Sequence, residues 1–397
     1  MRVGLVVPHI FMQRDILLGV IFSPGSLALA LAAGLEGLGA EVTLYSPGPV
    51  DTPVRNVTAD LGPFEAELQV RGDSYMDLLK KHPLVWASLA RQVQAELVAR
   101  VFADANAGKL DVVHVYANEE DIALPFAQFC RVPVVFTHHD PFDLLVKYRR
   151  GYARHKDLNW ISVSMAQRRG MPADTNWVAN IYHGLDGTAW RPAKRPRGDY
   201  FAYLGRIVET KGVHLAIGAV KKYNQLRRRA GFEPLPLKIA GKHYAGYGKD
   251  EYWRTQIEPE LGKDVEYVGH LRIAEEQSAF SANARAVLVP STFEEPFGMV
   301  MIESLASGTP VIGLDSGAIP EVIRDGETGF VVPKVVQGKQ IDEARTASGL
   351  AEAMVKIDRI DRRACRRDFE SRFTLDRMVL DHFELYKRLI IRASVLD

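Results

Sequence analysis

The chain has 397 residues, which is enough for two domains of ordinary size. It carries 50 Lys and Arg residues against 49 Asp and Glu residues, and the resulting formal charge of +1 argues against a nucleic-acid partner. The two cysteines, Cys130 and Cys365, are too few for a disulfide framework or a zinc site, and this composition is typical of the reducing cytoplasm.

The N-terminal segment predicts a strand, a helix and a second strand. We expect the first strand at residues 3–8, a loop around residues 23–25, and a helix that ends at Gly39. Residues 16–35 contain no charged side chain and are long enough to span a membrane, but Pro24-Gly25 breaks this stretch in its middle. The segment therefore predicts part of a soluble domain.

A buried strand at residues 134–136 precedes the polar sequence Thr137-His138-His139-Asp140. Ligands bind at the carboxyl ends of the strands in parallel α/β sheets, so two imidazoles and a carboxylate would lie at a binding edge. No further cluster of His or Cys completes a metal site, and we expect no metal. The alternative is that the two histidines form a structural cap at the strand end.

Residues 190–198 are rich in proline and arginine, as expected for a linker. We place a domain boundary there, with residues 1–192 in the first domain and residues 193–375 in the second.

The second domain opens with a strand that ends at Gly205-Arg206 and continues into a loop with Lys211 before a helix. Two cations at a helix start suit an anionic ligand such as a diphosphate. The alternative is that Arg206 and Lys211 are ordinary solvated surface residues, as an isolated Arg and Lys usually are. A second strand, ending at Gly241, and a third, at residues 265–271, are further units of a strand followed by a glycine.

Residues 287–333 predict a strand, a loop, a helix and further strands, the βαβ pattern of a parallel sheet. Gly298, at the end of the loop, lets the backbone approach a ligand, and the helix start after it offers N–H groups to an anion. Glu295 lies in the loop and Glu303 about two turns into the helix, and carboxylates accept hydrogen bonds from sugar hydroxyls. The alternative is a surface loop with two solvated glutamates.

These motifs resemble the family-4 retaining glycosyltransferases. The resemblance rests on the spacing Glu295-x7-Glu303 within EEPFGMVMIES, on SGTPVI and SGAIPEVIRDGETGF after it, and on Gly205-Arg206-x4-Lys211-Gly212. Enzymes of that family have the GT-B fold, an α/β architecture in which two Rossmann-like domains face each other across a cleft. The resemblance further implies that a C-terminal helix, residues 376–397, crosses back to pack on the N-terminal domain.

The resemblance implies a retaining glycosyltransferase that moves a sugar from a nucleotide-diphosphate sugar to an acceptor hydroxyl, without a metal or other cofactor. The acceptor would be a sugar, a lipid-linked compound or a small molecule. The protein would be cytoplasmic, with a peripheral contact to the membrane left open by the basic runs at residues 227–229 and 362–367. The donor base (UDP, GDP or ADP), the sugar, the acceptor and the oligomeric state do not follow from the sequence.

The family's site residues map onto this chain one by one. Arg206, Lys211 and the helix start at Gly298 would hold the diphosphate, Glu303 the ribose and Glu295 the sugar hydroxyls. The candidate catalytic residues are His139, which would lie beside the reacting sugar with His138 as the alternate, Glu295, Lys211 and Arg206. The candidate substrate-binding residues are Gly25, His138, Gly205, Gly241, Glu295, Pro296, Phe297, Gly298, Met299, Val300 and Glu303.

The chain departs from the family pattern at two positions. Many members carry a Gly-Gly pair in the first loop, where this chain has the single glycine Gly25 between Pro24 and Ser26. His183 replaces the usual Asn before the linker, and we assign it no catalytic role.

Two other functions would use the same scaffold. A GT-B nucleotide-sugar epimerase would need no acceptor, and donor alone would then yield an isomerised sugar. An inactive nucleotide-sugar-binding relative would keep the fold without turnover, and the presence of Arg206, Lys211, Glu295 and Glu303 argues against it.

Overall fold

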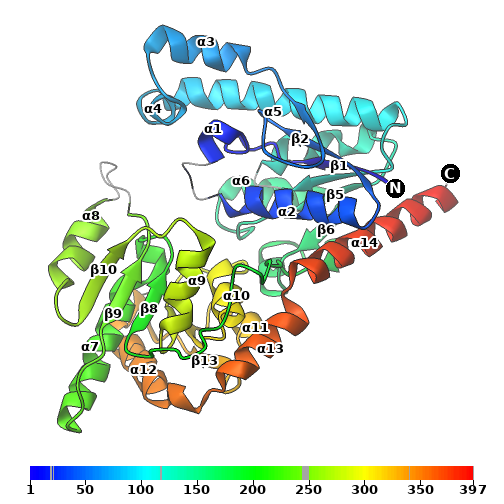
Figure 1. Ribbon diagram of the computed structural model, residues 1–397. Coiled ribbons are helices and arrows are strands. Elements are labelled where there is room, and N and C mark those ends of the chain that lie inside the picture. Colours follow the sequence, from blue (N-terminus) through cyan, green and yellow to red (C-terminus); the bar gives the residue numbers. More distant parts are fainter. Residues whose placement is uncertain (18–19, 21, 117–118, 244–249, 339, 397) are drawn as a thin grey trace. The chain divides into compact units, whose positions relative to one another are not determined.

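A computed structural model of the chain describes residues 1–397 except 18, 19, 21, 117, 118, 244–249, 339 and 397 (Figure 1). The chain folds into two compact units. The first consists of Met1–Gly184 and Leu375–Asp397, and the second of Leu185–Thr374. Residues 185–192, which the sequence analysis assigns to the first domain, thus pack with the second unit.

Within the described residues, the first unit contains a parallel sheet of seven strands in the order β3-β2-β1-β4-β5-β6-β7. The chain moves outward from β1 in one direction and then returns to add β4 on its other side. This reversal beside β1 is the place where ligands bind in open α/β sheets. The strands are β1 (Arg2–Val6), β2 (Glu41–Ser46), β3 (Arg55–Thr58), β4 (Val112–Tyr116), β5 (Val134–Thr137), β6 (Asn159–Ser162) and β7 (Trp177–Asn180).

Helices cover this sheet, and the C-terminal helix is one of them. α14 packs against α2 in the first unit, which confirms the prediction that the chain returns to its N-terminal domain. The α-helices are α1 (Arg14–Leu17), α2 (Ser23–Gly37), α3 (Gly62–Arg71), α4 (Tyr75–Lys81), α5 (Pro83–Asn106), α6 (Val146–Gly151) and α14 (Leu375–Leu396). Short 3₁₀ turns are η1 (Glu120–Ile122), η2 (Leu124–Phe129), η3 (Tyr152–His155) and η4 (Ala166–Gly170).

The second unit contains a parallel sheet of six strands in the order β10-β9-β8-β11-β12-β13, counted over the described part of the chain. Its order reverses between β8 and β11, so the ends of these two strands form the second switch point. The strands are β8 (Phe201–Leu204), β9 (Leu237–Ala240), β10 (Val265–Gly269), β11 (Val287–Val289), β12 (Val311–Leu314) and β13 (Gly329–Val332). A short hairpin, β14 (Val336–Gln337) and β15 (Gln340–Ile341), lies outside the sheet.

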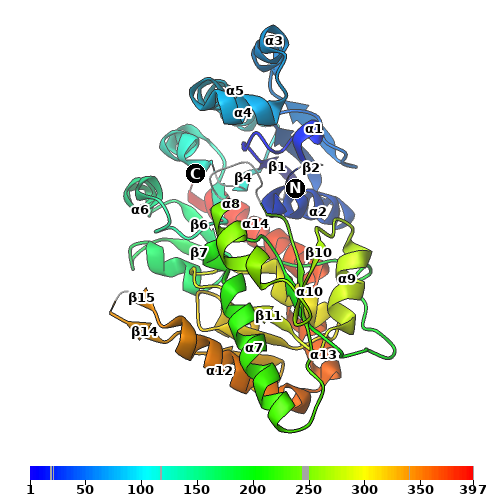
Figure 2. The ribbon, with the colours of Figure 1, turned by 90° about the vertical axis from the view of Figure 1, so that its left-hand side faces the viewer.

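The longest helices of the second unit, α7 and α12, lie side by side (Figure 2). Gly218 of α7 allows this approach, because a Cβ there would lie 3.3 Å from the Cβ of Ala347 in α12. The helices are α7 (Val213–Arg229), α8 (Asp250–Tyr252), α9 (Ala274–Asn283), α10 (Met299–Ala306), α11 (Ile319–Val322), α12 (Glu343–Lys356) and α13 (Arg362–Arg372), with η5 (Glu209–Lys211), the π-turn η6 (Trp253–Ile257), η7 (Glu258–Glu260) and η8 (Ile357–Arg359). This architecture confirms the predicted pair of Rossmann-like domains.

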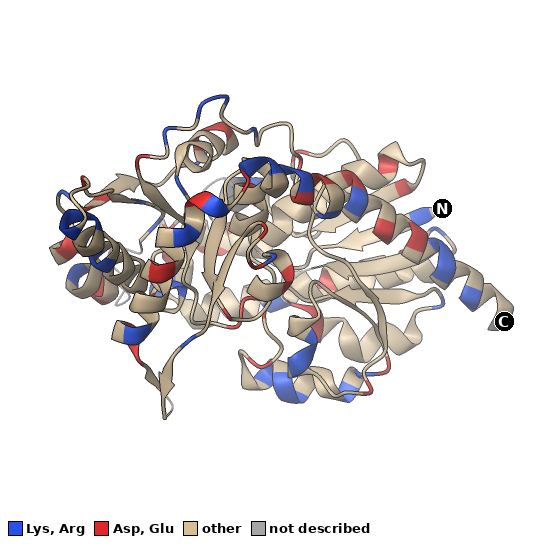
Figure 3. Cartoon of the chain, turned by 90° about the horizontal axis from the view of Figure 1, so that it is seen from below, with Lys and Arg blue, Asp and Glu red and all other residues tan. Residues whose placement is uncertain are grey.

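Both units carry basic and acidic side chains. Basic and acidic residues are interspersed within each of them in Figure 3, in line with the formal charge of +1. Among the described residues, none of the helices combines the length and the apolar character that crossing a bilayer requires.

We predict that Gly34→Ala destabilises the first unit, because a Cβ at Gly34 of α2 would lie 2.5 Å from Cγ2 of Val379 in α14. Overpacking of this kind costs about 1–3 kcal/mol, more than the gain in helix propensity of up to about 1 kcal/mol. Gly37→Ala is the matched control, since no atom lies within 4 Å of a Cβ there. Thermal denaturation should show a lower midpoint for Gly34→Ala and a higher one for Gly37→Ala. Equal shifts would contradict the close docking of α14 on α2.

Candidate active site

The loop after β11 brings two predicted catalytic residues into contact. Oε2 of Glu295 lies 2.6 Å from Nζ of Lys211 and accepts a further hydrogen bond of 3.3 Å from Ser291 Oγ. Glu295 is 7% exposed, and the Lys211 side chain is 20% exposed. The Lys211 ammonium also lies 5.4 Å from the ring centroid of Phe293. A largely buried ion pair therefore stands at the carboxyl edge of the sheet.

Backbone contacts hold the Lys211 loop against the Glu295 loop. The carbonyl of Thr210 accepts hydrogen bonds from the Thr292 N–H at 3.0 Å, from Thr292 Oγ1 at 3.2 Å and from Ser291 Oγ at 3.3 Å. Gly212 has a φ of 69°, and a Cβ at this position would lie 2.0 Å from the carbonyl oxygen of Pro290. The two loops thus approach so closely that only glycine fits at 212.

The Glu295 loop is fixed from its other side as well. The carbonyl of Glu295 accepts a 2.7 Å hydrogen bond from the Ala318 N–H, and Gly317 leaves no room for a Cβ beside it. Glu294 points to different partners: its carboxylate accepts from the Gly317 N–H at 2.9 Å and from Lys334 Nζ at 3.0 Å. The carboxylates of the two adjacent glutamates therefore have different partners, and that of Glu295 pairs with Lys211.

Helix α10 begins at Met299, after Gly298 with a φ of 88°. Glu303 is consequently the fifth residue of the helix, a little over one turn from its start, and not the two turns expected from the sequence. The reason is the left-handed conformation of Gly298, which excludes Phe297 from the helix. Burial raises the pKa of the Glu303 carboxyl to about 7.

The remaining candidates around Gly298 differ in what they can offer a ligand. The Phe297 ring is 2% exposed and packs at 6.0 Å on Phe373, so this side chain belongs to the core. Pro296 is also buried. Met299 and Val300 are half-buried at the start of α10, where backbone N–H groups have no partner inside the helix. Ligand contacts here would come mainly from the backbone.

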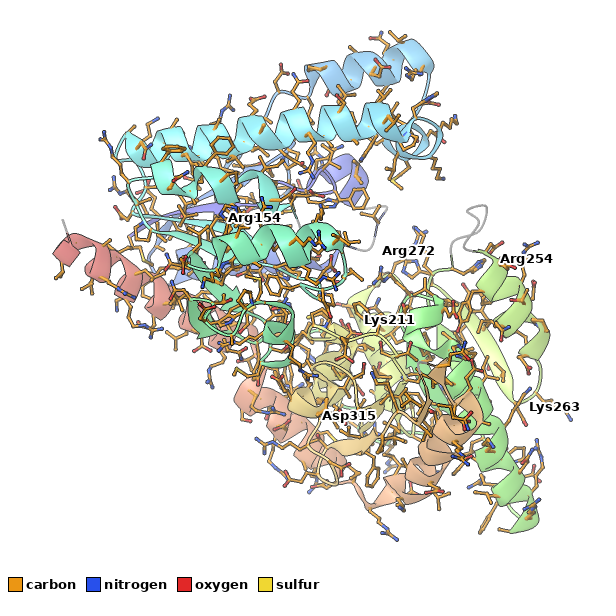
Figure 4. All side chains as sticks on the ribbon, turned by 180° about the vertical axis from the view of Figure 1, so that it is seen from behind. Arg154, Lys211, Arg254, Lys263, Arg272 and Asp315 are labelled. Atoms are coloured by element: carbon orange, nitrogen blue, oxygen red, sulfur yellow. The ribbon has the colours of Figure 1, made fainter. Side chains whose placement is uncertain are left out.

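Glycines end the neighbouring strands β8, β9 and β10. A Cβ at Gly241 would lie 1.9 Å from the carbonyl oxygen of Gly205, and the Gly241 N–H donates to Gly269 at 2.9 Å. Arg206 follows Gly205 with an exposed side chain, while its carbonyl accepts a 2.8 Å hydrogen bond from the Tyr203 hydroxyl. Arg206 thus follows the carboxyl end of β8, as does Lys211, which Figure 4 labels.

An aromatic group that the sequence analysis missed lies at the ends of β9 and β10. His243 stacks on Trp253 at 4.4 Å with an angle of 11° between the rings, and Tyr267 meets Trp253 at 4.7 Å. Spacing along the chain separates these residues, and only the fold brings them together.

In the first unit, the two adjacent histidines after β5 have different environments. His138 is fully buried, lies 3.1 Å from Glu120 Oε2 through Nδ1, and packs on Tyr148 at 4.5 Å. His139 is half-buried, meets Tyr116 edge-on at 4.6 Å, and stacks on His183 at 5.1 Å. His139 is therefore the more accessible of the two, and its position beside the reacting sugar stays a prediction.

His139, after β5, belongs to a group of imidazoles that includes His114 on β4, His183 after β7 and His382 on α14. The His114 ring lies 5.6 Å from the His382 ring, and its Nδ1 and Nε2 lie 2.6 Å from the Tyr386 hydroxyl and 2.8 Å from Thr137 Oγ1. Burial lowers the pKa of His139 and His114 well below the usual value, that of His183 to about 3 and that of His382 to about 4. Among the described residues, no group of His, Cys, Asp and Glu is arranged to hold a metal ion.

Gly25 lies in the first turn of α2 and not in the predicted loop. The helix begins at Ser23, and Pro24 is compatible with its first turn because the missing N–H would have no helical partner there. The Gly25 N–H donates to the carbonyl of Phe22 at 3.1 Å. Its predicted contact with the donor phosphate stays a prediction.

Comparisons with known proteins bear on this arrangement. Residues 188–353 match the family described as Glycosyl transferases group 1. The phosphatidyl-myo-inositol mannosyltransferase of Mycobacterium leprae is 26% identical over 374 residues, which cover 91% of this chain and 88% of the relative. The enzyme of the same name from Mycobacterium tuberculosis (strain CDC 1551 / Oshkosh) is 30% identical over 61% of this chain and 64% of its own length.

The chain is thus similar to the glycosyl transferases group 1 family over residues 188–353, and to the Mycobacterium leprae relative over most of its length. It is a retaining glycosyltransferase that uses a nucleotide-sugar donor, as the sequence analysis expected.

Solved structures support the fold of this glycosyltransferase. Sucrose-phosphate synthase from Thermosynechococcus elongatus superposes with a TM-score of 0.69 at 17% identity, covering 99% of this chain and 100% of that one. The Anabaena Alr3699/HepE structure with UDP and glucose gives 0.66 at 16% identity, covering 97% and 98%. The roles of individual side chains in the glycosyltransferase stay predictions.

We predict that Lys211→Ala lowers the turnover of the glycosyltransferase by roughly 10²-fold or more, the cost of losing one preorganised group at a leaving group. Lys334→Ala is the matched control, because Lys334 is also 20% exposed and pairs with the neighbouring glutamate, Glu294. It should cost less than about tenfold, since Glu294 keeps its bond to Gly317. Steady-state kinetics would compare them, with circular dichroism to check folding. Equal losses would remove Lys211 from the diphosphate site.

The buried imidazoles predict a loss of stability in acid. A histidine whose pKa is lowered by folding binds a proton more readily when unfolded, so its contribution is complete above about pH 6.5 and is lost as the pH falls toward about 4. Thermal midpoints measured from pH 7 to pH 4 should fall across this window, and His382→Phe should make the fall less steep. A midpoint independent of pH would contradict the neutral, buried state of these groups.

Proposed function

We propose that this enzyme transfers its sugar to a hydroxyl of a lipid-linked acceptor and works in the cytoplasm at a membrane surface. The names of the mycobacterial relatives, which specify a phosphatidylinositol acceptor, support this choice of acceptor class. The length over which the Mycobacterium leprae enzyme aligns supports it further, because the match includes the N-terminal half in which an acceptor would bind.

The Lys211–Glu295 ion pair is the observation that carries the donor side of the proposal. A nucleotide diphosphate that reaches Lys211 and Arg206 must compete with the carboxylate of Glu295 for the Lys211 ammonium. The exchange would release Glu295 toward the sugar hydroxyls and bring the diphosphate to the start of α10 at Gly298, where helix N–H groups favour an anion. Donor binding and the placement of Glu295 would therefore be one event.

In the proposed step, the bond between the sugar C1 and the diphosphate oxygen breaks as the acceptor oxygen bonds to C1 from the same face. The acceptor proton passes to the departing phosphate, so no covalent nucleophile from the protein is needed. Lys211 and Arg206 stabilise the charge that grows on the leaving group, and we expect this stabilisation to lower the barrier more than any other contact of the protein. His139 is neutral at physiological pH, because burial lowers its pKa, and would orient the acceptor side as a hydrogen-bonding group.

The proposal is tested by incubating the enzyme with radiolabelled UDP-, GDP- and ADP-hexoses and with vesicles that contain phosphatidylinositol, or with free inositol and simple sugars instead. We expect label in the organic phase with one of the donors. Label only in water-soluble products would overturn the lipid acceptor, and an isomerised donor without transfer would favour an epimerase.

Glu303 should act in donor binding and depend on pH. A carboxylate that holds ribose hydroxyls makes the same contact in the ground and transition states, so Glu303→Gln should raise the donor KM more than it lowers kcat. Because the pKa of Glu303 is about 7, the wild-type KM should also rise as the pH falls below that value, and Glu303→Gln should remove this trend. A variant with an unchanged KM would exclude the ribose contact.

Substitutions of the two adjacent histidines should affect different measurements, kcat for His139 and the thermal midpoint for His138. His139→Ala should depress kcat while donor affinity, measured by calorimetry, and thermal stability are largely kept. His138→Ala should instead lower the thermal midpoint, because it removes the partner of Glu120 within a core of tyrosine rings. If neither variant changed kcat, the acceptor side of the proposed site would be wrong.

A further inference from the structure

One short segment of the first unit has a charge unlike that of the whole chain. From Leu144 to Lys156 the sequence contains five Lys or Arg residues and no Asp or Glu, although the chain carries only +1 overall. The segment comprises the end of the loop after β5, helix α6, the turn η3 and the residue after it. None of the donor-site motifs includes it.

The fold divides this segment into a buried face and an exposed face. Tyr148 and Tyr152 are 4% and 0% exposed and pack on His138 at 4.5 Å and 5.2 Å. Three consecutive apolar residues before them remain in solvent: Leu144 is 47% exposed, Leu145 44% and Val146 61%. The tyrosines thus anchor α6 to the strand end that carries His139, while the apolar residues point away from the core.

The cations on the same segment are mostly unpaired. Among the described residues, carboxylates come within 4.0 Å of only two of the five, Lys147 near Glu119 and Asp121, and Lys156 near Asp174. Arg149, Arg150 and Arg154 are exposed, and Figure 4 labels Arg154 on the turn after α6. We call Leu144, Leu145, Val146, Arg149, Arg150 and Arg154 the α6 surface.

Two physical requirements meet on the α6 surface. Exposed leucine and valine gain free energy when they leave water, and arginine pairs favourably with phosphate. A nucleic acid or an acidic protein segment would satisfy the arginines and leave the apolar triplet in a polar environment. A bilayer with anionic headgroups satisfies both, with the apolar side chains at the acyl boundary and the arginines at the phosphates.

We propose that the α6 surface docks the enzyme on anionic phospholipid. This inference rests on the proposed lipid acceptor and names the surface that would meet the membrane. Because Tyr148 and Tyr152 of this segment pack on His138, docking would bring lipid headgroups next to His139, on the acceptor side of the proposed site.

Sedimentation of the protein with vesicles tests the proposal. The probes are vesicles of phosphatidylcholine alone and vesicles with added phosphatidylglycerol. The wild type should bind the anionic vesicles, and Arg149→Glu/Arg150→Glu/Arg154→Glu should weaken this binding by about tenfold or more. Leu145→Ser/Val146→Ser should weaken it as well. Lys194→Glu/Arg195→Glu/Lys263→Glu, an equal charge change on exposed residues of the second unit, should leave it close to wild type.

Each outcome decides the proposal. Equal losses in both charge-reversed variants would overturn it in favour of a general charge effect, and binding of an RNA duplex without binding of vesicles would point to another partner. Wild-type binding that depends on the α6 surface, with no lipid serving as acceptor, would uphold the surface and overturn the proposed acceptor. Transfer to a lipid that does not depend on these residues would uphold the proposed acceptor and overturn the docking role of the α6 surface. Unchanged thermal midpoints show that the variants fold.

Discussion

The ion pair between Lys211 and Glu295 is the interaction on which the candidate donor site depends. Its two charges lie 2.6 Å apart in a largely buried position, where removing either one leaves the other without compensation. The loops that carry them follow the strands β8 and β11. These strands are far apart in the sequence but pair directly in the sheet, which brings the two loops together. An ammonium group held by a carboxylate in this way is poised to exchange one anion for another. This is the property that a diphosphate-binding site requires.

Backbone crowding explains why the pair is so well defined. Gly212 lies against Pro290, Gly317 against Glu295, and Gly241 against Gly205, at distances that exclude any side chain. These contacts fix the relative positions of the loops by steric exclusion, whereas the ion pair acts on groups that are already in place. The preorganisation of charge therefore comes from the main chain, which limits the reorganisation needed as the leaving group departs.

Much of this could be predicted from the sequence, for physical reasons that vary with position. Apolar runs such as residues 287–289 predict buried parallel strands, and the Glu295 loop after them falls at a strand end by topology alone. The start of α10 could not be predicted, because it depends on the left-handed conformation of Gly298. In the sequence, Pro24 indicates a loop, because proline breaks a helix interior. In the structure, Pro24 lies in the first turn of α2, where proline is tolerated, and Gly25 is therefore helical.

Contacts distant in sequence were beyond the reach of pattern analysis. Lys334 lies forty residues from Glu294, and the sequence shows no sign that it pairs with that residue and leaves Glu295 to Lys211. The burial of His138 depends on η1 and α6, which supply Glu120 and Tyr148 as its neighbours. The basic and apolar character of residues 144–156 was readable in the sequence, but the exposure of Leu144, Leu145 and Val146 was not, because a run of apolar residues more often indicates a buried element.

Calorimetry with a nucleoside diphosphate tests the exchange at Lys211 most directly. UDP and GDP would be titrated into the wild type, Lys211→Ala and Glu295→Gln. Our account predicts weaker binding for Lys211→Ala and equal or tighter binding for Glu295→Gln, because the amide competes less strongly for the Lys211 ammonium than the carboxylate does. If Glu295→Gln weakened binding as much as Lys211→Ala, the pair would be a fixed structural unit and the proposed exchange would be wrong.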